Sequence, residues 1–368
     1  MIADIERLVR CESPSSDRDA VARSADEVTE VGSRLLGQLP ERIVIDGRTH
    51  LRWRFGDQSR VLLLGHHDTV WPIGSLGAHP FEARDGILRG PGCFDMLAGV
   101  VMAMYAIAAL DDRDGVTLLV TGDEELGAPS SRGLIEDEAR HCAAALVLEA
   151  SADGGALKTE RKGVSLYEVC LHGRAAHAGL EPELGVNATV EAARQILAVA
   201  ELGASSAGTT VTPTVLDAGT TTNTVAAAGR FAVDVRIRTT AEQDRVDHAM
   251  HALRPTLDDA RIEVLGGPNR PPLQATASAK LFSRVSRLAE DLGLERPRSA
   301  AVGGASDGNF TAGIGTPTLD GLGAVGGGAH ADDEHVVIDQ LAPRTTLLSA
   351  LVADVLATAP APATLGQG

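Results

Sequence analysis

The chain has 368 residues, of which 44% are hydrophobic and 23% are charged, and its formal net charge is −17. This length exceeds what one hydrophobic core usually serves, so two domains are expected. The acidic balance argues against a nucleic-acid partner, because phosphate binding needs concentrated Lys and Arg. The four cysteines form no C-x-x-C pair, and the chain does not begin with a basic segment followed by an apolar one. These features predict a reduced, cytoplasmic protein without a signal peptide.

The first part of the chain alternates helical and strand patterns. Such alternation predicts an α/β fold with a mostly parallel sheet flanked by helices. The longest apolar run, Leu97–Leu110, is too short to cross a bilayer, so no membrane partner is expected. The predicted helices are 1–10, 16–39 and 97–110, and the predicted buried strands are 60–65, 116–121 and 143–149.

The pattern changes near residue 164 to the order β-α-β-β-α-β, which is typical of a ferredoxin-like α+β sandwich. We therefore expect a large catalytic domain formed by 1–163 and 274–358, an inserted domain over 164–273, and a disordered tail over 359–368. The inserted elements are strands 164–171, 209–216, 230–238 and 261–265 with helices 186–202 and 241–257. The later elements are a helix over 279–292, a short strand near Ala300 and a helix over 338–356.

Acids and histidines stand at the ends of the apolar runs of the large domain. His66 and Asp68 follow the first strand two residues apart, so their side chains leave on the same side while His67 points away. We predict His66 as a metal ligand and Asp68 as the residue that hydrogen-bonds the other imidazole nitrogen. Asp95 precedes an apolar helix, so it is either an N-cap or a carboxylate that bridges two metal ions; the neighbouring acids favour the bridge.

Two adjacent acids, Glu124 and Glu125, follow the second strand. One can ligate a metal while the other acts as general base, and a solvated acidic turn is an equally good interpretation of the pair alone. Glu149 ends an apolar strand, where an unpaired charge is costly. His330 follows small residues, which let the backbone come close to a crowded site. We therefore prefer it to His335 as a ligand. The set suits two metal ions with one acid to spare.

The segments around these residues resemble, in order along the chain, the five metal-site motifs of the dizinc aminoacylase/carboxypeptidase family. That family includes glutamate carboxypeptidase, acetylornithine deacetylase and succinyl-diaminopimelate desuccinylase, and this chain is most similar to the bacterial glutamate carboxypeptidases. The resemblance implies a zinc-peptidase-like fold and an inserted lid and dimerisation domain. The matching motifs are Gly65–Val70, Gly90–Met96, Asp123–Glu125, Glu149 and Gly328–His330, with further matches at 70–74, 177–179, 182–188 and 269–272.

The resemblance also implies a role for each of these residues. Asp95 would bridge two Zn²⁺ ions, Glu124 would be the general base and Asp68 would orient His66. On the inserted domain, His177 would stabilise the oxyanion and reach the neighbouring subunit's site in a homodimer, where Asn223 would join it. The implied ligand pairs are His66 with Glu149 and Glu125 with His330.

Arginines suggest where a substrate carboxylate binds. Alternation along 230–238 places Arg236 and Arg238 on the open face of a strand, where an arginine can grip a carboxylate with two hydrogen bonds. Arg236 matches the family's carboxylate-binding arginine, whereas we expect Arg238 to pair with Asp234 or face solvent. Arg270 is a second candidate. Gly304 and Ser306 lie in a glycine-rich segment that resembles the family's substrate-facing loop, although such a segment can be only a turn.

One departure from the family pattern follows Asp95-Met96, where Leu97-Ala98-Gly99 replaces the usual Lys-Gly-Gly. No ligand is lost, so two metal ions are still expected. The leading hypothesis is a zinc-dependent amidohydrolase that cleaves an amide beside a free α-carboxylate of an N-acyl amino acid or peptide, releasing glutamate or a similar residue. The alternatives are an N-acyl-amino-acid deacylase of the acetylornithine or succinyl-diaminopimelate type and a catalytically silent metal-binding dimer, which the intact Glu124 and His177 disfavour.

Overall fold

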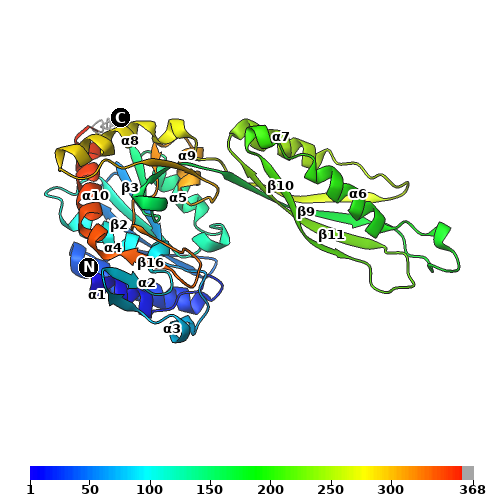
Figure 1. Ribbon diagram of the computed structural model, residues 1–368, viewed down its shortest axis with the longest axis horizontal. Helices are drawn as coiled ribbons and strands as arrows, with labels where there is room; N and C mark the ends of the chain where they lie inside the picture. The colour runs from blue at the N-terminus through cyan, green and yellow to red at the C-terminus, as the bar shows by residue number, and fades with distance from the viewer. Residues whose placement is uncertain (359–368) are drawn as a thin grey trace, which may run out of the picture. The chain divides into compact units, whose positions relative to one another are not determined.

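The computed structural model describes residues 1–358, and the chain folds into two compact units (Figure 1). Unit 1 contains Met1–Glu160, Leu273–Val302 and the described residues from Ser306 onwards. Unit 2 contains Arg161–Pro272 and the short segment Gly303–Ala305. The tail over 359–368, for which we predict disorder, lies outside the described residues.

Unit 1 is built on a six-stranded sheet that is mostly parallel. The four neighbours from β6 to β14 run parallel, whereas β1 and β2 are antiparallel at one edge. This arrangement confirms the predicted fold class. In spatial order the strands are β1 (Glu41–Ile45), β2 (Arg48–Phe55), β6 (Val116–Thr121), β3 (Val61–His66), β7 (Ala144–Val147) and β14 (Thr318–Leu319).

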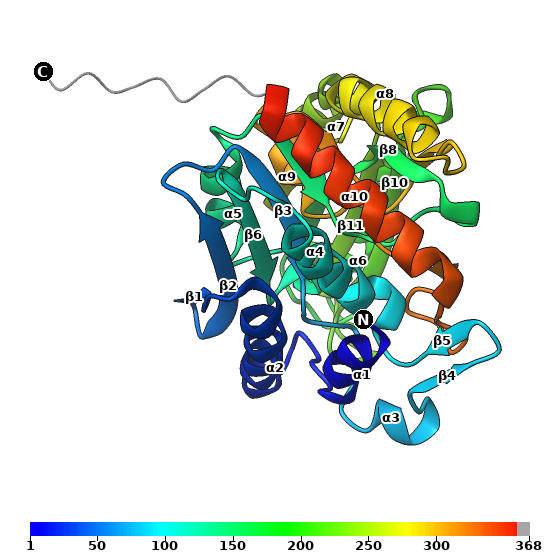
Figure 2. The same cartoon turned by 90° about the vertical axis from the view of Figure 1, so that its left-hand side faces the viewer.

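Both faces of this sheet are covered, which explains why its strands are continuously apolar. Along β3, Val61 and Leu63 belong to one hydrophobic core, and Leu62 and Leu64 belong to a second core on the other face. Figure 2 shows α4 and α10 in front of the sheet. The helices of the first core are α1 (Ile2–Arg10), α2 (Arg18–Leu36), α4 (Ala98–Ala108), α8 (Ala275–Asp291) and α10 (Ile338–Thr358), and those of the second are α5 (Arg132–Ala139) and α9 (Gly308–Gly313).

Helix α10 alone among the described helices is long and apolar enough to span a membrane by length and composition. Its apolar residues are used differently here, because Leu348, Leu351 and Val352 are buried in the first core of unit 1. The helix also packs against α4 and α8. We therefore interpret α10 as a core helix.

Two smaller sheets complete unit 1. β16 (His335–Val337) pairs with both β15 (Gly326–Gly327) and β5 (Ile87–Arg89), and this pairing brings the loop that carries His330 beside the segment that carries Asp95.

The hydroxyl of Ser278 donates a hydrogen bond of 2.8 Å to the carbonyl of Thr159, which joins the two chain segments on either side of unit 2. The remaining elements are α3 (Ser75–Ala78), β4 (Glu82–Arg84), β8 (Leu157–Arg161) and β13 (Ser299–Val302).

Unit 2 has a four-stranded antiparallel sheet in the order β10-β11-β9-β12. Helices α6 and α7 cover one face of it, and the chain order is the predicted β-α-β-β-α-β (Figure 1). Helix α7 ends at His251, earlier than predicted, because Pro255 disfavours a helical residue before it. The elements are β9 (Gly163–His172), α6 (Ala188–Ala200), β10 (Thr210–Ala218), β11 (Ala228–Ile237), α7 (Thr240–His251) and β12 (Arg261–Arg270).

Candidate metal centre

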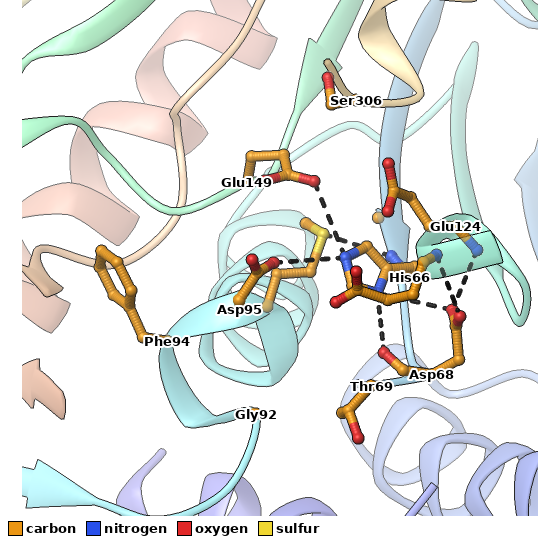
Figure 3. Close-up of polar contacts among 12 residues, drawn as sticks. His66, Asp68, Thr69, Gly92, Phe94, Asp95, Glu124, Glu149 and Ser306 are labelled. Carbon is orange, nitrogen blue, oxygen red and sulfur yellow. Dashed lines mark hydrogen bonds and ion pairs between the residues drawn. The ribbon is translucent and has the colours of Figure 1, made fainter. Parts of the chain in front are cut away.

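His66 is the last residue of β3, and its imidazole is almost fully buried. Its Nδ1 lies 2.9 Å from the backbone carbonyl of Asp68, so Nδ1 carries a proton and Nε2 presents a lone pair in the neutral ring. Nε2 faces carboxylate oxygens of Asp95 at 3.4 Å and Glu149 at 3.7 Å (Figure 3). Within residues 1–358, no hydrogen-bond partner is found for this buried nitrogen. Three groups of lone pairs therefore converge on a volume that suits a cation.

Asp95 lies in an irregular turn between β5 and α4. Its backbone dihedrals are φ −116° and ψ 95°. Helix α4 begins at Ala98 with Leu97 as its N-cap residue, and no side chain makes a capping hydrogen bond there. Asp95 therefore does not cap the helix, and the N-cap alternative is wrong. Its carboxylate instead lies between two imidazoles, with one oxygen 3.4 Å from His66 Nε2 and the other 3.2 Å from His330 Nε2.

Glu124 and Glu125 begin a short 3₁₀ turn directly after β6. Their backbone N–H groups donate to the carboxylate of Asp68 at 3.2 and 3.3 Å, and the hydroxyl of Ser15 donates to it at 2.6 Å. The carboxylate is 3.5 Å from His66 Nδ1, while the Asp68 carbonyl makes the shorter contact with that nitrogen. The carboxylate of Asp68 therefore faces Nδ1 of His66 as predicted, while its main-chain carbonyl makes the shorter contact. The same carboxylate also holds the backbone of the two glutamates.

His330 lies in the loop before β16 and is half-exposed. Its Nε2 is 3.1 Å from a carboxylate oxygen of Glu125, whereas His335, the rejected alternative, is bonded to the carbonyl of Asp333.

Glu149 lies two residues beyond the end of β7, and the ammonium group of Lys158 is 3.9 Å from its carboxylate. Sequence reasoning missed Lys158, although lysine is rare in this chain.

The ligand-type atoms of these residues form overlapping groups. One group contains His66, Asp95 and Glu149, and another contains Asp95, Glu125 and His330, with all ligand atoms of each group within 4.8 Å of one another. Asp95 is common to both. A third group joins His66 with Glu124 and Glu125. Imidazole and carboxylate donors with one shared acid fit a pair of divalent ions.

The protonation of this cluster follows from the same contacts. Hydrogen bonds to Asp95 and Glu125 raise the pKa of His330 to about 10. Burial would raise the pKa of Asp95, but the neighbouring imidazoles of His330 and His66 hold it well below its ordinary value. These carboxylates therefore favour a proton on the imidazole of His330. A metal ion at this imidazole would replace that proton, because metal binding requires neutral imidazole.

His67 points away from the cluster, as alternation along β3 predicts. Its ring nitrogens lie 3.2 Å from the Ser24 hydroxyl and 3.1 Å from the Thr49 carbonyl. Burial lowers the pKa of His67 to about 4. A neutral, hydrogen-bonded imidazole of this kind has a structural role.

Two predicted residues of unit 2 lie on adjacent backbone segments. His177 is exposed and bridges to Thr224, and the carbonyl of Asn223 accepts a hydrogen bond of 2.9 Å from Ala178 N–H. The Nδ1 atom of His177 accepts from Gly179 N–H at 3.1 Å. In the neutral ring the proton is therefore on Nε2, which can donate a hydrogen bond.

Alternation along β11 is as predicted, with Val233 and Val235 buried and Arg236 on the other face. The Asp234 ion pair belongs to Arg236, however, through two hydrogen bonds of 2.8 and 2.9 Å. Arg238 is exposed, which is the solvent-facing alternative of our prediction. Arg236 remains 35% exposed, so a ligand carboxylate can reach it. Arg270, at the end of β12, is 8% exposed, which leaves little of it accessible.

The glycine-rich segment after β13 separates into two parts. The carbonyl of Gly304 accepts a hydrogen bond of 3.1 Å from Arg161 within unit 2. Ser306 is fully buried in unit 1, and its hydroxyl donates to Asp320 at 2.6 Å. Because this hydroxyl is buried and already hydrogen-bonded, we withdraw Ser306 as a substrate contact.

The departure at Leu97-Ala98-Gly99 has a packing explanation in part. Leu97 and Ala98 are buried in the first core, where a lysine would need a partner. Gly99 is retained because a Cβ there would lie 2.1 Å from the carbonyl oxygen of Leu148. The close approach of α4 to the chain before Glu149 therefore requires glycine at this position.

Known proteins resemble this chain over nearly its whole length. A profile of peptidase family M20/M25/M40 matches residues 62–354. Carboxypeptidase G2 of Pseudomonas sp. (strain RS-16) is 27% identical over 372 residues, covering 96% of this chain and 89% of the relative. Succinyl-diaminopimelate desuccinylase of Methylorubrum extorquens (strain PA1) is 26% identical over 373 residues, covering 92% and 94%. Among solved structures, the M20 family metallo-carboxypeptidase Sso-CP2 from Sulfolobus solfataricus has a TM-score of 0.74 at 15% identity, covering 95% of this chain and 97% of that one.

Proposed function

Because this chain belongs to peptidase family M20/M25/M40 and is a hydrolase of peptide or amide bonds, we propose that it is a dinuclear-zinc carboxypeptidase. Its substrate would be an N-acyl amino acid or peptide with a free α-carboxylate, and it would release a C-terminal glutamate or similar residue. The observation that carries this proposal is the sharing of Asp95 between two groups of ligand-type atoms.

Five side chains would hold the metal ions. His66 and Glu149 would complete one site, Glu125 and His330 the other, and Asp95 would bridge them. When bound, the ions would supply a Lewis acid for the amide carbonyl and lower the pKa of the attacking water. Zn²⁺ is the ion that we propose, since imidazole and carboxylate ligands suit it.

Glu124 would be the general base. Its side chain is 7% exposed, and its backbone N–H is fixed by Asp68, so it is held at the edge of the cluster with restricted freedom. The carboxylate would take a proton from the attacking water and deliver it to the nitrogen of the leaving amine. Glu125, on the same turn, is directed to His330 instead.

His177 and Arg236 would act on the substrate from unit 2. The Nε2–H of His177 would donate to the developing oxyanion, which is consistent with the tautomer that Gly179 favours. Arg236 would bind the α-carboxylate in place of Asp234, because a guanidinium can grip a carboxylate through two hydrogen bonds. Asn223, Arg270 and the backbone of Gly304 are further candidates for substrate contact.

A second candidate function is a deacylase whose recognised part is the acyl group. The similarity to succinyl-diaminopimelate desuccinylase favours it. The same cluster would serve both reactions, because each hydrolyses an amide. The two differ in the part of the substrate that the enzyme recognises, which is the amino acid for the carboxypeptidase and the acyl group for the deacylase.

The test is release of amino acids from a panel of N-acyl amino acids, with and without a chelator, followed by metal analysis of the pure protein. We expect turnover that the chelator abolishes and that depends most on the C-terminal residue. Dependence mainly on the acyl group in matched series would favour the deacylase. Chelator-insensitive turnover, or no turnover on a broad panel, would refute both.

We also propose a homodimer formed through unit 2 and a cytoplasmic location. The dimer would let His177 serve the neighbouring subunit. The location is supported by the absence of disulfides among residues 1–358, in which all four cysteines are free. Size-exclusion chromatography with light scattering tests the dimer.

A further inference from the structure

Glu334 is a buried acid that sequence reasoning missed, and the residue is 4% exposed. Four N–H groups converge on it. One oxygen accepts from Phe94 N–H at 2.8 Å and Asp95 N–H at 3.0 Å, and the other accepts from Gly92 N–H at 2.9 Å and the indole of Trp71 at 2.7 Å. Both oxygens of the carboxylate are therefore fully used by the protein.

These bonds join three chain segments, each of which carries a residue of the candidate metal centre. Trp71 lies on the segment that follows His66. The Gly92–Asp95 turn carries the shared carboxylate. Glu334 itself is four residues after His330, and its own N–H closes that loop by donating to Ala331 at 3.0 Å. One carboxylate thus connects the chain segments beside three candidate ligands, one of them through the indole of Trp71.

The turn that Glu334 binds has no regular helix or strand to hold it. Asp95 has non-helical dihedrals, and α4 begins after it. Three donors of such a turn would be buried without partners if the carboxylate were absent, and the turn would then reorient to satisfy them. Asp95 would move with the turn. Its carboxylate lies 3.4 Å from His66 and 3.2 Å from His330, and both distances would change.

We propose that Glu334 is the positioning residue of the metal centre, which fixes Asp95 between His66 and His330 through the backbone of the Gly92–Asp95 turn. It is not itself a ligand, since neither of its oxygens belongs to a group of ligand-type atoms among the described residues. This inference rests on the proposed function, in that it presumes two bound ions.

The test measures metal binding directly on the full-length chain. Apo-protein of wild type and of Glu334→Gln is titrated with Zn²⁺ against a chromophoric chelator and with Co²⁺ by absorption spectroscopy. The amide of Gln would place an NH₂ group against two N–H donors, so the turn must shift. We expect the affinity for at least one ion to fall about 10- to 100-fold, which is the usual effect of removing a residue that orients ligands, and the Co²⁺ spectrum to change.

The matched control is Glu138→Gln, which changes another buried carboxylate of unit 1 that bonds Arg52, Arg54 and Ser59. It should lower the melting temperature and leave the metal affinity and the Co²⁺ spectrum as in wild type. Trp71→Phe, which removes one of the four donors, should weaken metal binding less than Glu334→Gln does. If Glu334→Gln does not fold, metal binding by Trp71→Phe is compared with that of wild type instead.

The outcomes separate this inference from the proposed function. Wild-type protein that fails to bind two ions would refute the proposed function and this inference with it. Wild-type protein that binds two ions, beside a folded Glu334→Gln with the same affinities and spectrum, would refute the inference alone. If only Trp71→Phe folds, unchanged binding in that variant refutes the inference.

Discussion

The two units differ in how they hold their candidate functional side chains. In unit 1, His66 and Glu149 are buried, the carbonyl of Asp68 orients His66, and the carboxylate of Asp68 holds the glutamate turn. In unit 2, His177 is exposed, and Arg236 is partly exposed and paired with a residue of its own strand. Buried polar groups are costly unless they are satisfied, whereas exposed ones can exchange partners with water at little cost.

This difference assigns different tasks to the units. The cluster of unit 1 has little freedom to move, since its carboxylates and imidazoles are largely buried and fixed by hydrogen bonds. The residues of unit 2 can change partners, because Arg236 and Asp234 are both partly exposed. Under the proposed function, Arg236 would exchange Asp234 for a substrate carboxylate. Variants of unit 1 should therefore affect catalysis and stability strongly, and variants of unit 2 should affect substrate binding moderately.

The largest effect is expected for Glu124→Gln. Loss of the general base should lower kcat by about 10²- to 10⁴-fold, because proton transfer no longer has a carboxylate acceptor. Metal content, measured by elemental analysis, should stay at two ions per chain. Full activity in this variant would show that the base assignment is wrong.

The next effect concerns the packing that places Glu149. Gly99→Ala puts a methyl group 2.1 Å from the Leu148 carbonyl, so the free energy of unfolding should fall by about 1–3 kcal/mol, as for other overpacked interiors. Gly133→Ala in α5 is the control, because no atom lies within 4 Å of its new Cβ. Urea denaturation should place Gly133→Ala within about 1 kcal/mol of wild type. Equal stability of the two variants would contradict the close approach of α4.

A comparable but pH-dependent effect is expected at Glu138. Burial would raise the pKa of this carboxyl, but hydrogen bonds from Ser59 and Arg54 hold it below its ordinary value. A lowered pKa contributes stability above the unfolded-state value, which is lost as the pH falls through the folded-state value. Glu138→Gln should therefore cost about 1–3 kcal/mol at pH 7, and the gap to wild type should shrink below pH 4.5. A gap that is constant from pH 7 to about 3.5 in denaturation experiments would refute this.

The smallest effect is expected in unit 2. Arg236→Ala should raise KM for a substrate with a free α-carboxylate about 10-fold, which corresponds to one partly exposed charged contact, and should change kcat little. Arg238→Ala is the matched control and should leave KM unchanged. Asp234→Asn should lower KM, because it weakens the internal competitor for Arg236. A kcat effect of Arg236→Ala as large as that of Glu124→Gln would remove the contrast between the units.

Sequence reasoning succeeded where a local pattern determines structure. The strand over 116–121 has the predicted bounds, and alternation along β3 separates His66 from His67 correctly. The motif resemblance is confirmed by the family match. The hairpin of β1 and β2 was missed, although Asp46 and Gly47 at its turn, both with positive φ, are a recognisable hairpin signal.

The remaining features depend on contacts between distant parts of the chain. Periodicity cannot show that β16 pairs with β5, and this pairing is what brings His330 to Asp95. It also cannot show that Asp68 holds the glutamate turn or that Glu334 binds the Gly92–Asp95 turn. The prediction that Ser306 contacts the substrate failed for the same reason, because only the folded chain reveals its bond to Asp320.

The bond between Ser278 and Thr159 has a consequence for how this chain can fold and evolve. It brings together the two ends that flank unit 2. In unit 2, Val164 pairs with Arg270, so the entering and leaving strands are also neighbours. The entropy of closing a loop grows only slowly with its length, so the host core loses little by carrying such an insertion. The host core can therefore tolerate changes in the length of such an insertion while its own fold is kept.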